Sequence, residues 1–577
     1  MELEQELARR VADAVRSGLD LDITAEEAVI RPTASGRGAD YQSNAAMPLA
    51  KRLGRPPLEI GQTIAERLDL GDVLEPAQAE GRGFVNLTLR REWLEGRVAA
   101  LRRDERLGIV ATDRPRRVVL DYSAINVAKE MHVGHLRSTI IGDAINRLLR
   151  FRGEDVVPQN HIGDWGTPLG MLLEHLLDEE ESQGAETEIG ELTEFYQAAR
   201  RKFDSDPEFQ QRARLRVVAL QSGDGATLEL WHDLIGKSMR YVDRLYDLLG
   251  VLLTQADVAG ESLYNPMLAD VAEELESRGL ARIVDGALMA FPPGFTGRDD
   301  RPVPLIVRKS DGGYTYDTTD LAAIRYRARD LHADDILYVV GSPQRLHLEM
   351  LFAMAREAGW LPPEARAAHV AFGQVLGRDG KRFRTREGES IKLIELLEEA
   401  VERAAAVVAE RSELTEDERR RVAQAVGVGA VKYADLSGDR IKDYVFDWDR
   451  MLAMDGNTSV YLQYANARVR SVVRRAGGEA PAGTPIALEE PAERALALAL
   501  ARFPTAVETT IAHLQPHRLC TYLYDTAVAF STFYEKCSIL SADTPELRAS
   551  RLVLCELTSK VLVRGLDLLG IEAPDRL

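Results

Sequence analysis

The sequence has few cysteines, and their spacing excludes two kinds of site. Only Cys520, Cys537 and Cys555 occur among 577 residues, and no two of them form a C-x-x-C pair. Disulfide frameworks and most structural zinc sites need paired, closely spaced cysteines. We therefore expect a protein of the reducing cytoplasm that has neither disulfides nor a zinc site.

Long apolar runs and a surplus of basic residues are absent as well. No stretch approaches the ~20 apolar residues that cross a bilayer, and the start, Met-Glu-Leu-Glu-Gln-Glu, lacks the apolar core of a secretion signal. With 92 acidic and 73 basic residues the formal net charge is −19, which argues against non-specific coating of nucleic acid. A local basic face can still bind RNA phosphates within an acidic protein. We expect no membrane association.

Length and patterning predict three parts. At 577 residues the chain has room for three or four domains of ~150 residues each. Residues 1–112 predict a small N-terminal α/β domain. Residues 113–448 alternate strand and helix patterns, which is typical of a Rossmann-type parallel sheet, and a charged helical stretch at about 172–300 looks like an insertion into it. Residues 449–577 are almost wholly helical in pattern and predict an all-α bundle.

The strongest local pattern lies where a predicted strand gives way to a helix. The apolar run Val118–Leu120 precedes a polar loop containing His132-Val-Gly-His135, and the amphipathic helix that follows ends at Gly153. Helix N-termini favour phosphate, and two imidazoles add donors at the same place. Gly134 leaves room for a flat base against the backbone. Alone, H-x-G-H is a weak pattern, and two helix-capping histidines are the alternative interpretation.

Other polar residues follow predicted strands further along the chain. Gln344 comes after the buried strand Asp335–Gly341, and Tyr314–Asp320 comes after sheet patterning at Pro302–Val307. Ligands of open parallel sheets bind at the carboxyl ends of the strands. The loop Gly377–Gly388 is rich in glycine and basic residues and suits a triphosphate. A solvated surface hairpin is the alternative for that loop.

Two segments predict contact with RNA. Tyr461, Tyr464 and Arg468 share one face of a predicted helix, and aromatics interleaved with arginine can stack on single-stranded bases. Asn86 lies on the outward side of the alternating strand Gly81–Leu89 and is a candidate contact there. In both segments ordinary packing is the alternative.

These motifs together resemble arginyl-tRNA synthetases, a family of class I aminoacyl-tRNA synthetases. The resemblance covers the whole chain and rests on Asn126–Thr139, Asn160–Thr167, Tyr316-x-x-x-Asp320, Tyr461–Tyr464 and the ending Leu568–Leu577. It implies that arginine attacks the α-phosphate of ATP, giving arginyl-adenylate and pyrophosphate. The arginyl group then passes to the 3′ end of tRNA(Arg), which releases AMP. Members of this family are also known for needing tRNA before the adenylate forms.

The resemblance implies roles for single residues. His132 and His135 would hold the phosphates of ATP with adenine over Gly134. Magnesium would arrive with ATP, held mainly by phosphates and water, so neither a dedicated metal site nor a tightly bound cofactor is expected. Six residues would build the arginine pocket: Asp121, Ser123, Asn126, Tyr316, Asp320 and Gln344. The helical C-terminal domain, through Tyr461, Tyr464 and Arg468, would bind the anticodon arm, and the N-terminal domain, through Asn86, the outer corner of the tRNA.

The chemistry of arginine agrees with two of these assignments. A guanidinium is a planar fork of five donors with a permanent charge, and it demands carboxylates that accept paired bonds. Asp121 and Asp320 at strand ends would supply them. Neutral isosteres would leave buried carboxylates unpaired, a rejection of about 10⁴-fold or more. This explains why no editing module is evident in the sequence.

The sequence departs from the family pattern in two places. Ile125 stands where the family usually has proline before its first signature. The second signature, K-M-S-K-S, is degenerate, and Thr385 falls where its catalytic lysine is expected. We therefore predict that Lys129 supplies the missing positive charge. Further ATP contacts are predicted from Lys381, Arg384 and Arg386.

Other functions share part of this pattern. Another class I synthetase or a nucleotidylyltransferase would use the same H-x-G-H site, but its pyrophosphate exchange would not respond to arginine alone. A non-catalytic paralogue that binds RNA or arginine would tolerate loss of His135. We expect a cytoplasmic enzyme that is a monomer, although the sequence itself does not determine the oligomeric state.

Overall fold

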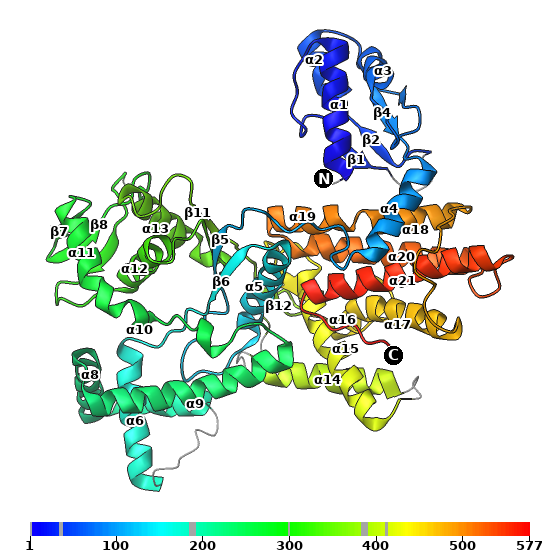
Figure 1. Cartoon of the computed structure of the whole chain (residues 1–577). Coiled ribbons are helices and arrows are strands. Elements are labelled where there is room, and N and C mark those ends of the chain that lie inside the picture. The colour runs from blue at the N-terminus through cyan, green and yellow to red at the C-terminus, as the bar shows by residue number, and fades with distance from the viewer. Residues whose placement is uncertain are drawn as a thin grey trace. The chain divides into compact units, whose positions relative to one another are not determined.

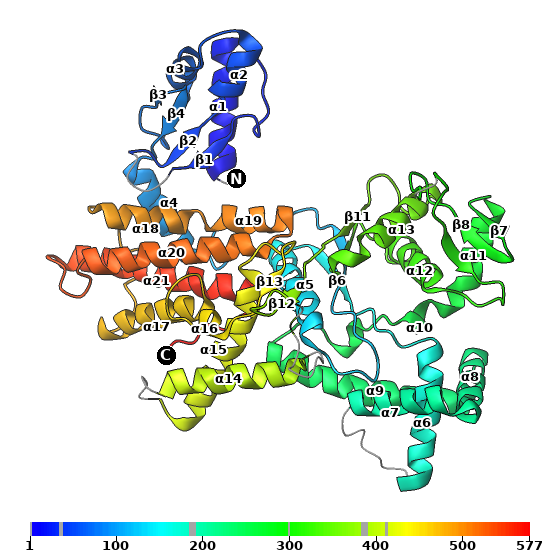
Figure 2. The same ribbon diagram turned by 180° about the vertical axis from the view of Figure 1, so that it is seen from behind.

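The computed structural model describes residues 3–33, 38–183, 192–297, 300–381, 383, 391–409 and 414–577. They form two compact units (Figures 1 and 2). The first unit comprises Met1–Val110, Ala453–Asp567 and Glu572–Leu577, and the second comprises Ala111–Leu452 and Leu568–Ile571. The expected N-terminal and C-terminal domains therefore share one compact unit, and the expected catalytic domain fills the other.

The N-terminal part of the first unit packs helices against a small sheet. Its antiparallel strands follow the order β1 (Ile30–Pro32), β2 (Tyr41–Ser43), β4 (Phe84–Leu87), β3 (Gln78–Glu80). Its helices are α1 (Leu3–Leu19), α2 (Ala46–Leu53), α3 (Pro57–Arg67) and α4 (Arg91–Arg103). The apolar face of α1 is buried through Leu7, Val11 and Val15, as its helical periodicity predicts.

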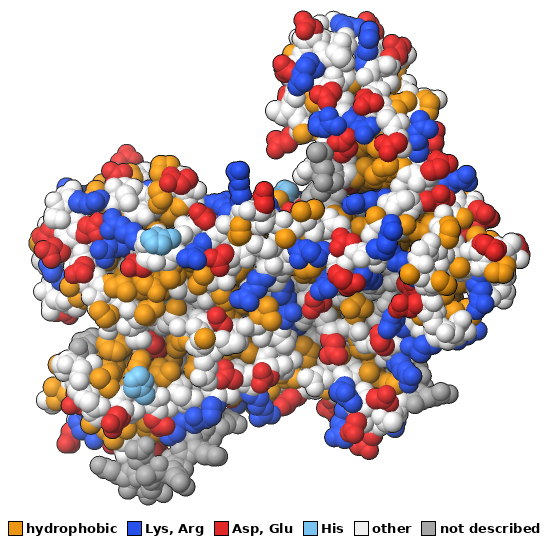
Figure 3. All heavy atoms as spheres, in the orientation of Figure 1, with side chains coloured by type: hydrophobic (Ala, Val, Ile, Leu, Met, Phe, Trp, Pro, Cys, Tyr) orange, Lys and Arg blue, Asp and Glu red, His pale blue; other side chains and the backbone are white. Residues whose placement is uncertain are grey.

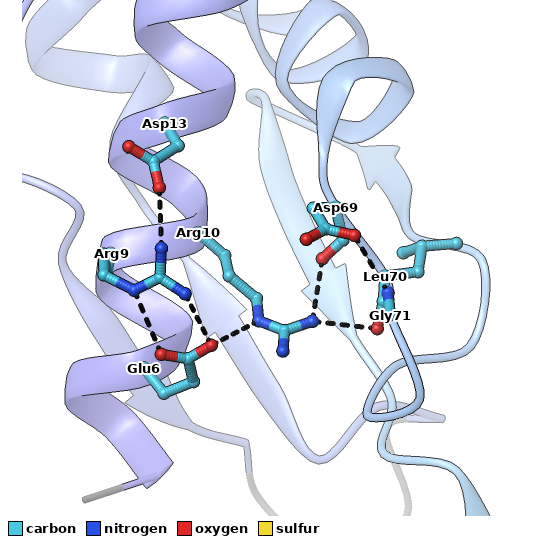
Figure 4. A network of polar contacts seen from close by, with 7 residues as sticks. All are labelled: Glu6, Arg9, Arg10, Asp13, Asp69, Leu70 and Gly71. Carbon is cyan, nitrogen blue, oxygen red and sulfur yellow. Dashed lines mark hydrogen bonds and ion pairs between the residues drawn. The ribbon is translucent and has the colours of Figure 1, made fainter. Parts of the chain in front are cut away.

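The polar side of α1 is tied to the chain that follows α3. Arg10 bonds Glu6 at 2.7 Å within the helix and donates to the backbone carbonyls of Asp69 and Leu70 at 3.1 and 3.0 Å (Figure 4). Hydrogen bonds from Arg9 and then Arg10 hold the pKa of Glu6 below its usual value. This network holds α1 against the segment that follows α3.

The C-terminal part of the first unit is a helical bundle, as expected. Its helices are α17 (Ser459–Arg475), α18 (Pro491–Ala501), α19 (Phe503–His513), α20 (Pro516–Lys536) and α21 (Pro545–Leu568). The stretch Pro491–His513 is long and apolar enough to cross a membrane by length and composition, but half of it is buried inside the fold. That burial is what helices in a bundle core show. The three cysteines are buried, and none of them is in a disulfide.

The second unit contains the expected parallel sheet. Its strands follow the order β11 (Arg366–His369), β10 (Asp335–Tyr338), β5 (Arg117–Asp121), β6 (Asp155–Gln159), and every neighbouring pair is parallel. Helix α5 (Val133–Arg152) joins β5 to β6, and α13 (Arg345–Glu357) lies between β10 and β11. The two connections run outward in opposite directions, so the strand order reverses between β5 and β10. Open sheets bind ligands at such a switch point.

A second, antiparallel sheet corrects one expectation. The apolar stretch Pro302–Val307 does not rejoin the parallel sheet. Its residues enter β9 (Leu305–Arg308), which belongs to a separate sheet of order β7 (Ala281–Val284), β8 (Ala287–Ala290), β9. The hairpin between β7 and β8 turns on Asp285 and Gly286 at φ 50° and 81°, and such two-residue turns impose antiparallel pairing. The pattern of apolar and polar residues alone did not show which of the two sheets this stretch joins.

Helices make up the rest of the second unit. Those of the insertion are α6 (Thr167–Gln183), α7 (Leu192–Ser205), α8 (Pro207–Ser222), α9 (Gly225–Leu249), α10 (Glu261–Tyr264) and α11 (Leu268–Ser277). Helix α12 (Tyr316–Arg329) follows β9. The elements after the parallel sheet are β12 (Val375–Leu376), α14 (Leu393–Ala409), α15 (Glu416–Leu436), β13 (Tyr444–Val445) and α16 (Trp448–Met451).

Buried ionic contacts lock α5 in place. Arg137, only 2% exposed, pairs with Asp435 of α15 at 3.0 Å. Further along α5, Asp143 lies against Gly570, where an added Cβ would come within 2.9 Å of the Asp143 carboxylate and 2.8 Å of Lys432 Nζ. Burial lowers the pKa of Lys432 to about 8. Gly570 also has φ +69°, so both its conformation and its surroundings require glycine. The helix that begins with the histidine motif is therefore rigidly held.

Candidate active site

Two histidines begin α5 at the switch point of the sheet. The Nδ1 atom of His132 accepts the N–H of Gly134 at 3.0 Å, and the Nδ1 atom of His135 accepts the N–H of His132 at 3.1 Å. The ring centroids are 4.0 Å apart. Because both Nδ1 atoms accept backbone hydrogens, each neutral ring carries its proton on Nε2. Two Nε2–H donors are thus left for a ligand.

The surroundings keep both imidazoles neutral at pH 7. Burial, followed by the charges of His132 and Lys129, lowers the pKa of His135 to about 4. Burial followed by the charge of Lys129 also holds the pKa of His132 below its usual value. Neutral rings of this tautomer donate hydrogen bonds and do not change charge near pH 7.

Lys129 lies close to the histidine pair. Its side chain is exposed, and its Nζ lies 4.3 Å from the ring centroid of Tyr196 on α7. Its charge acts on both His132 and His135. This position suits the predicted cation for phosphate.

The chain after the basic loop runs against the histidine motif. The N–H of Val133 donates to the carbonyl of Ile391 at 3.1 Å, and the N–H of Leu393 donates to the carbonyl of Met131 at 2.8 Å. Between them the backbone of Lys392 pairs with that of His132 in an isolated antiparallel β-bridge. The sequence analysis missed Lys392, because nothing in its local pattern marks it as close to the motif.

The basic loop itself is described only in part. Lys381 is exposed and closes a turn in which the N–H of Gly377 donates to its carbonyl at 2.7 Å. The predicted contacts Arg384 and Arg386, together with Thr385, lie outside the described residues.

The first two motifs meet at one close contact. The N–H of Gly163 donates to the carbonyl of Ile125 at 2.8 Å, and that of Val127 donates to the carbonyl of Gly163 at 3.3 Å. A Cβ on Gly163 would lie 2.7 Å from Oδ1 of Asn126. The exposed Asn126 therefore needs glycine at this position, and the loops after β5 and β6 form one wall.

Two residues predicted for the arginine pocket lie beneath the surface. Asp121 is 6% exposed, and its carboxylate already pairs with Arg327 at 2.8 Å. The hydroxyl of Ser123 accepts a hydrogen bond from Tyr246 at 2.7 Å and pairs with Thr139 at 2.9 Å. These contacts do not support direct binding of substrate by the side chains of Asp121 and Ser123. The partner of Asp121 is an arginine of the chain itself, and local sequence patterning does not reveal such a pair.

The remaining predicted pocket residues gather at the start of α12 and before α13. Tyr316 is 69% exposed, and its ring centroid lies 5.4 Å from that of His347. The carboxylate of Asp320 lies 2.6 Å from Nε2 of His347. Gln344 is exposed in the short 3-10 helix Ser342–Gln344, just ahead of α13. The sequence pattern predicts that Tyr316 and Asp320 follow a parallel strand. In the structure they follow β9 of the antiparallel sheet.

An acidic residue from the insertion also faces this region. Burial, followed by the charges of Asp164 and Asp320, raises the pKa of Glu261 to about 7. Asp164 is fixed by the N–H and hydroxyl of Ser262, at 2.9 and 2.6 Å. A carboxyl with a raised pKa beside two further acids favours a cationic ligand. Glu261 carries no motif, so sequence reasoning missed it.

The candidate RNA contacts lie on the first unit. Tyr461, Tyr464 and Arg468 are half-buried on α17. The guanidinium of Arg468 lies 4.8 Å from the ring centroid of Tyr464 and 5.4 Å from that of Tyr534. On β4, Asn86 accepts a hydrogen bond from Gln42 at 3.0 Å across the ladder. Acidic and basic side chains are intermingled over the face in Figure 3.

No metal centre is evident in the part of the chain that the structure describes: no group of three or more histidine, cysteine, aspartate or glutamate side chains is placed to hold an ion there.

Comparison with known families covers the chain from end to end. Residues 97–448 match the catalytic domain of the class I tRNA synthetases (R). Residues 462–577 match the DALR anticodon binding domain, and residues 1–89 match the arginyl tRNA synthetase N terminal domain.

Individual proteins agree with these matches. The chain is 54% identical to the arginine–tRNA ligase of Thermobifida fusca over 575 residues, which is 99% of each protein. It is 45% identical to that of Pasteurella multocida, covering 98% of this chain and 100% of the relative. Arginyl-tRNA synthetase structures from Plasmodium falciparum and Thermus thermophilus align over 100% of each chain, with TM-scores of 0.86 and 0.81 and identities of 28% and 26%. The chain belongs to the arginyl-tRNA synthetase family of class I aminoacyl-tRNA synthetases.

Proposed function

We propose that this protein is an arginine–tRNA ligase, which activates L-arginine with ATP and transfers it to the 3′ end of tRNA(Arg). The observation that carries the proposal is the identity of 44–54% to arginine–tRNA ligases over at least 96% of the chain. The geometry supports it, because phosphate donors and acidic groups both lie at the ligand-binding edge of the sheet.

The histidine pair is proposed to bind the phosphates of ATP. The Nε2–H groups of His132 and His135 would donate to phosphate oxygens at the N-terminus of α5, where the helix dipole adds positive potential. A Cβ at Gly134 would lie 2.7 Å from Cε1 of His132, so glycine both keeps the ring in place and leaves space for adenine. Magnesium would enter with ATP, bound to phosphates and water.

Positive charge near the α-phosphate is proposed to come from lysine. As arginine attacks, charge grows on the pyrophosphate that leaves, and fixed cations stabilise it. Lys129 acts electrostatically on the histidine pair, which makes it the first candidate. Lys381, Arg384 and Arg386 are the further candidates from the basic loop.

The arginine pocket is proposed to use Asp320 as its principal carboxylate. Tyr316, Gln344 and Asn126 are exposed near strand or helix ends and would complete it. Asp121 and Ser123 would lie beneath the pocket and support the residues that line it, as their buried contacts indicate. A guanidinium held by a partly buried carboxylate makes charge-assisted bonds that no neutral amino acid can replace.

The first unit is proposed to bind tRNA. The helical bundle would bind the anticodon arm with Tyr461, Tyr464 and Arg468, and the N-terminal layer would contact the outer corner of the tRNA near Asn86. We propose a monomeric enzyme that acts in the cytoplasm. The tRNA assignments rest on the family matches at each end of the chain.

Pyrophosphate exchange tests the proposal. The purified protein should exchange labelled pyrophosphate into ATP with arginine and tRNA together, and not with arginine alone. Omission of tRNA and replacement of arginine by lysine are the controls. Exchange driven by a different amino acid would reject the assignment.

A further inference from the structure

One histidine reaches both carboxylates at the start of α12. Nε2 of His347 lies 2.6 Å from Oδ2 of Asp320, and its Nδ1 lies 3.7 Å from Oδ1 of Asp317. The ring centroid of Tyr316 lies 5.4 Å away on one side. His347 is thus the centre of a half-buried cluster formed by α12 and α13.

The two carboxylates differ in how firmly they are held. Asp317 is buried and accepts the backbone N–H of Ile306 at 2.7 Å, which ties it to β9. Asp320 is half-buried, and among the described residues His347 is the group that hydrogen-bonds its carboxylate. The orientation of Asp320 therefore depends on His347.

The charges around His347 are acidic. Burial alone lowers the pKa of His347, but the hydrogen bond that it donates to Asp320 and the charges of Asp320 and Asp317 outweigh burial and raise the pKa. From α10, Glu261 faces Asp320. The cluster therefore favours a cation, and its acidic side chains stabilise the protonated form of His347.

We propose that His347 is the positioning residue of the arginine pocket and that its proton competes with substrate. Its Nε2–H fixes one oxygen of Asp320, which leaves the other for the guanidinium. When arginine binds, a second positive charge enters the cluster, and the imidazolium of His347 releases its Nδ1 proton to solvent while its Nε2–H stays on Asp320. This inference rests on the proposed function, because it needs arginine to be the substrate.

Thermodynamic linkage gives the proposal its signature. If arginine binding releases a proton, lower pH must weaken arginine binding by the same coupling. Below the pKa of His347 the dissociation constant of arginine should rise by up to about tenfold for each pH unit. If His347 only connected α13 to α12, it would affect stability and would not contribute to the pH dependence of arginine binding.

Titration calorimetry with the full-length protein measures this directly. L-arginine is titrated at several values between about pH 6 and about pH 8.5, in two buffers with different heats of ionisation. We expect proton release near neutral pH and a dissociation constant that rises as pH falls. His347→Asn keeps an N–H donor and cannot be protonated, so it should lose most of the proton release and most of the slope, and only the share that comes from Glu261, with its pKa of about 7, should remain.

A matched control separates this effect from the loss of any histidine. His513 is exposed on α19 and bonds the carbonyl of Thr509 at 2.9 Å, so His513→Asn should retain the wild-type slope. Arginine binding to the wild type without proton release would overturn the inference, whether or not the His347 variant folds. An unchanged slope in His347→Asn would overturn it too. Failure of the wild type to bind arginine at all would instead reject the proposed function.

Discussion

The carboxylate of Asp121 pairs with the guanidinium of Arg327 at 2.8 Å, and both side chains are buried. Arg327 also donates to Oε1 of Gln159 at 2.6 Å and lies over the ring of Tyr338, 4.9 Å from its centroid. Three strands, β5, β6 and β10, are thus joined to α12 below the proposed pocket. Asp121, which the sequence predicts to bind the substrate guanidinium, pairs in this structure with the guanidinium of the protein's own Arg327.

The first prediction concerns this buried pair. Asp121→Asn should lower the free energy of unfolding by about 3–5 kcal/mol, because it leaves the charge of Arg327 without its partner. Urea denaturation measures the loss. The double variant Asp121→Leu with Arg327→Met should recover much of it, since no charge is then left buried. Wild-type stability in Asp121→Asn, combined with a large rise in the KM for arginine, would return Asp121 to the pocket.

The second prediction concerns the donor on His135. His135→Asn keeps an acceptor for the N–H of His132 and removes the Nε2–H, so kcat should fall about 10²–10³-fold with little change in Tm. His135→Gln, which offers an amide donor near the lost position, is the matched control and should lose less. Steady-state charging and thermal melting provide the two readouts. Wild-type kcat in His135→Asn would mean that the helix cap, and not the donor, matters.

The same histidine predicts a pH dependence of stability. Its pKa falls from 6.5 to about 4 on folding, so between these values the unfolded chain binds the additional proton. Stability contributed by His135 should therefore be complete above about pH 6.5 and be lost as the pH falls towards about 4. Denaturation across this range should show a shallower loss in His135→Asn than in the wild type.

The third prediction concerns Glu261. Its pKa rises from 4.5 to about 7 on folding, so the folded protein binds the additional proton between these values. Stability should fall as pH rises through this window, by up to about 3 kcal/mol. Glu261→Gln removes that loss and should be more stable than the wild type at about pH 8, while its KM for arginine rises. Glu273→Gln, an exposed acid on α11, is the control, and an equal gain there would contradict the assignment.

The fourth prediction concerns α17. Tyr464→Ala should raise the KM for tRNA several-fold, because a base loses its aromatic partner, while charging at saturating tRNA changes little. Tyr464→Phe keeps the ring under Arg468 and should behave nearly as the wild type. A collapse of arginine activation at saturating tRNA, with unchanged tRNA affinity, would show that Tyr464 does not bind tRNA.

Periodicity predicted the elements that hold the site. The apolar run Val118–Leu120, the helix ending at Gly153 and the strand at Asp335 all appear where their patterns predict. These predictions depend on local alternation and capping, which are evident in a single sequence. The assignment of Pro302–Val307 to the parallel sheet was wrong, because sheet membership depends on pairing between distant segments.

The chemistry of the site could be predicted only where motifs carry it. His132 and His135 occupy the predicted helix start because the same residues cap the helix and face the ligand edge. Arg327, Glu261, His347 and Lys392 come from segments without a signature. Their positions follow from tertiary packing, which brings α10, α12, α13 and the start of α14 to the ends of β5 and β10. The pairing of these charged residues with partners from distant segments therefore could not be predicted from the sequence.

The most direct measurement is aminoacylation of total tRNA with each of the twenty amino acids, using the wild type and Asp320→Asn. The account predicts that the wild type charges tRNA with arginine alone. In Asp320→Asn the KM for arginine should rise about 10²-fold or more, because a charged acceptor for the guanidinium is lost, and the KM for ATP should hardly change. Charging with another amino acid, or full arginine affinity in Asp320→Asn, would contradict it.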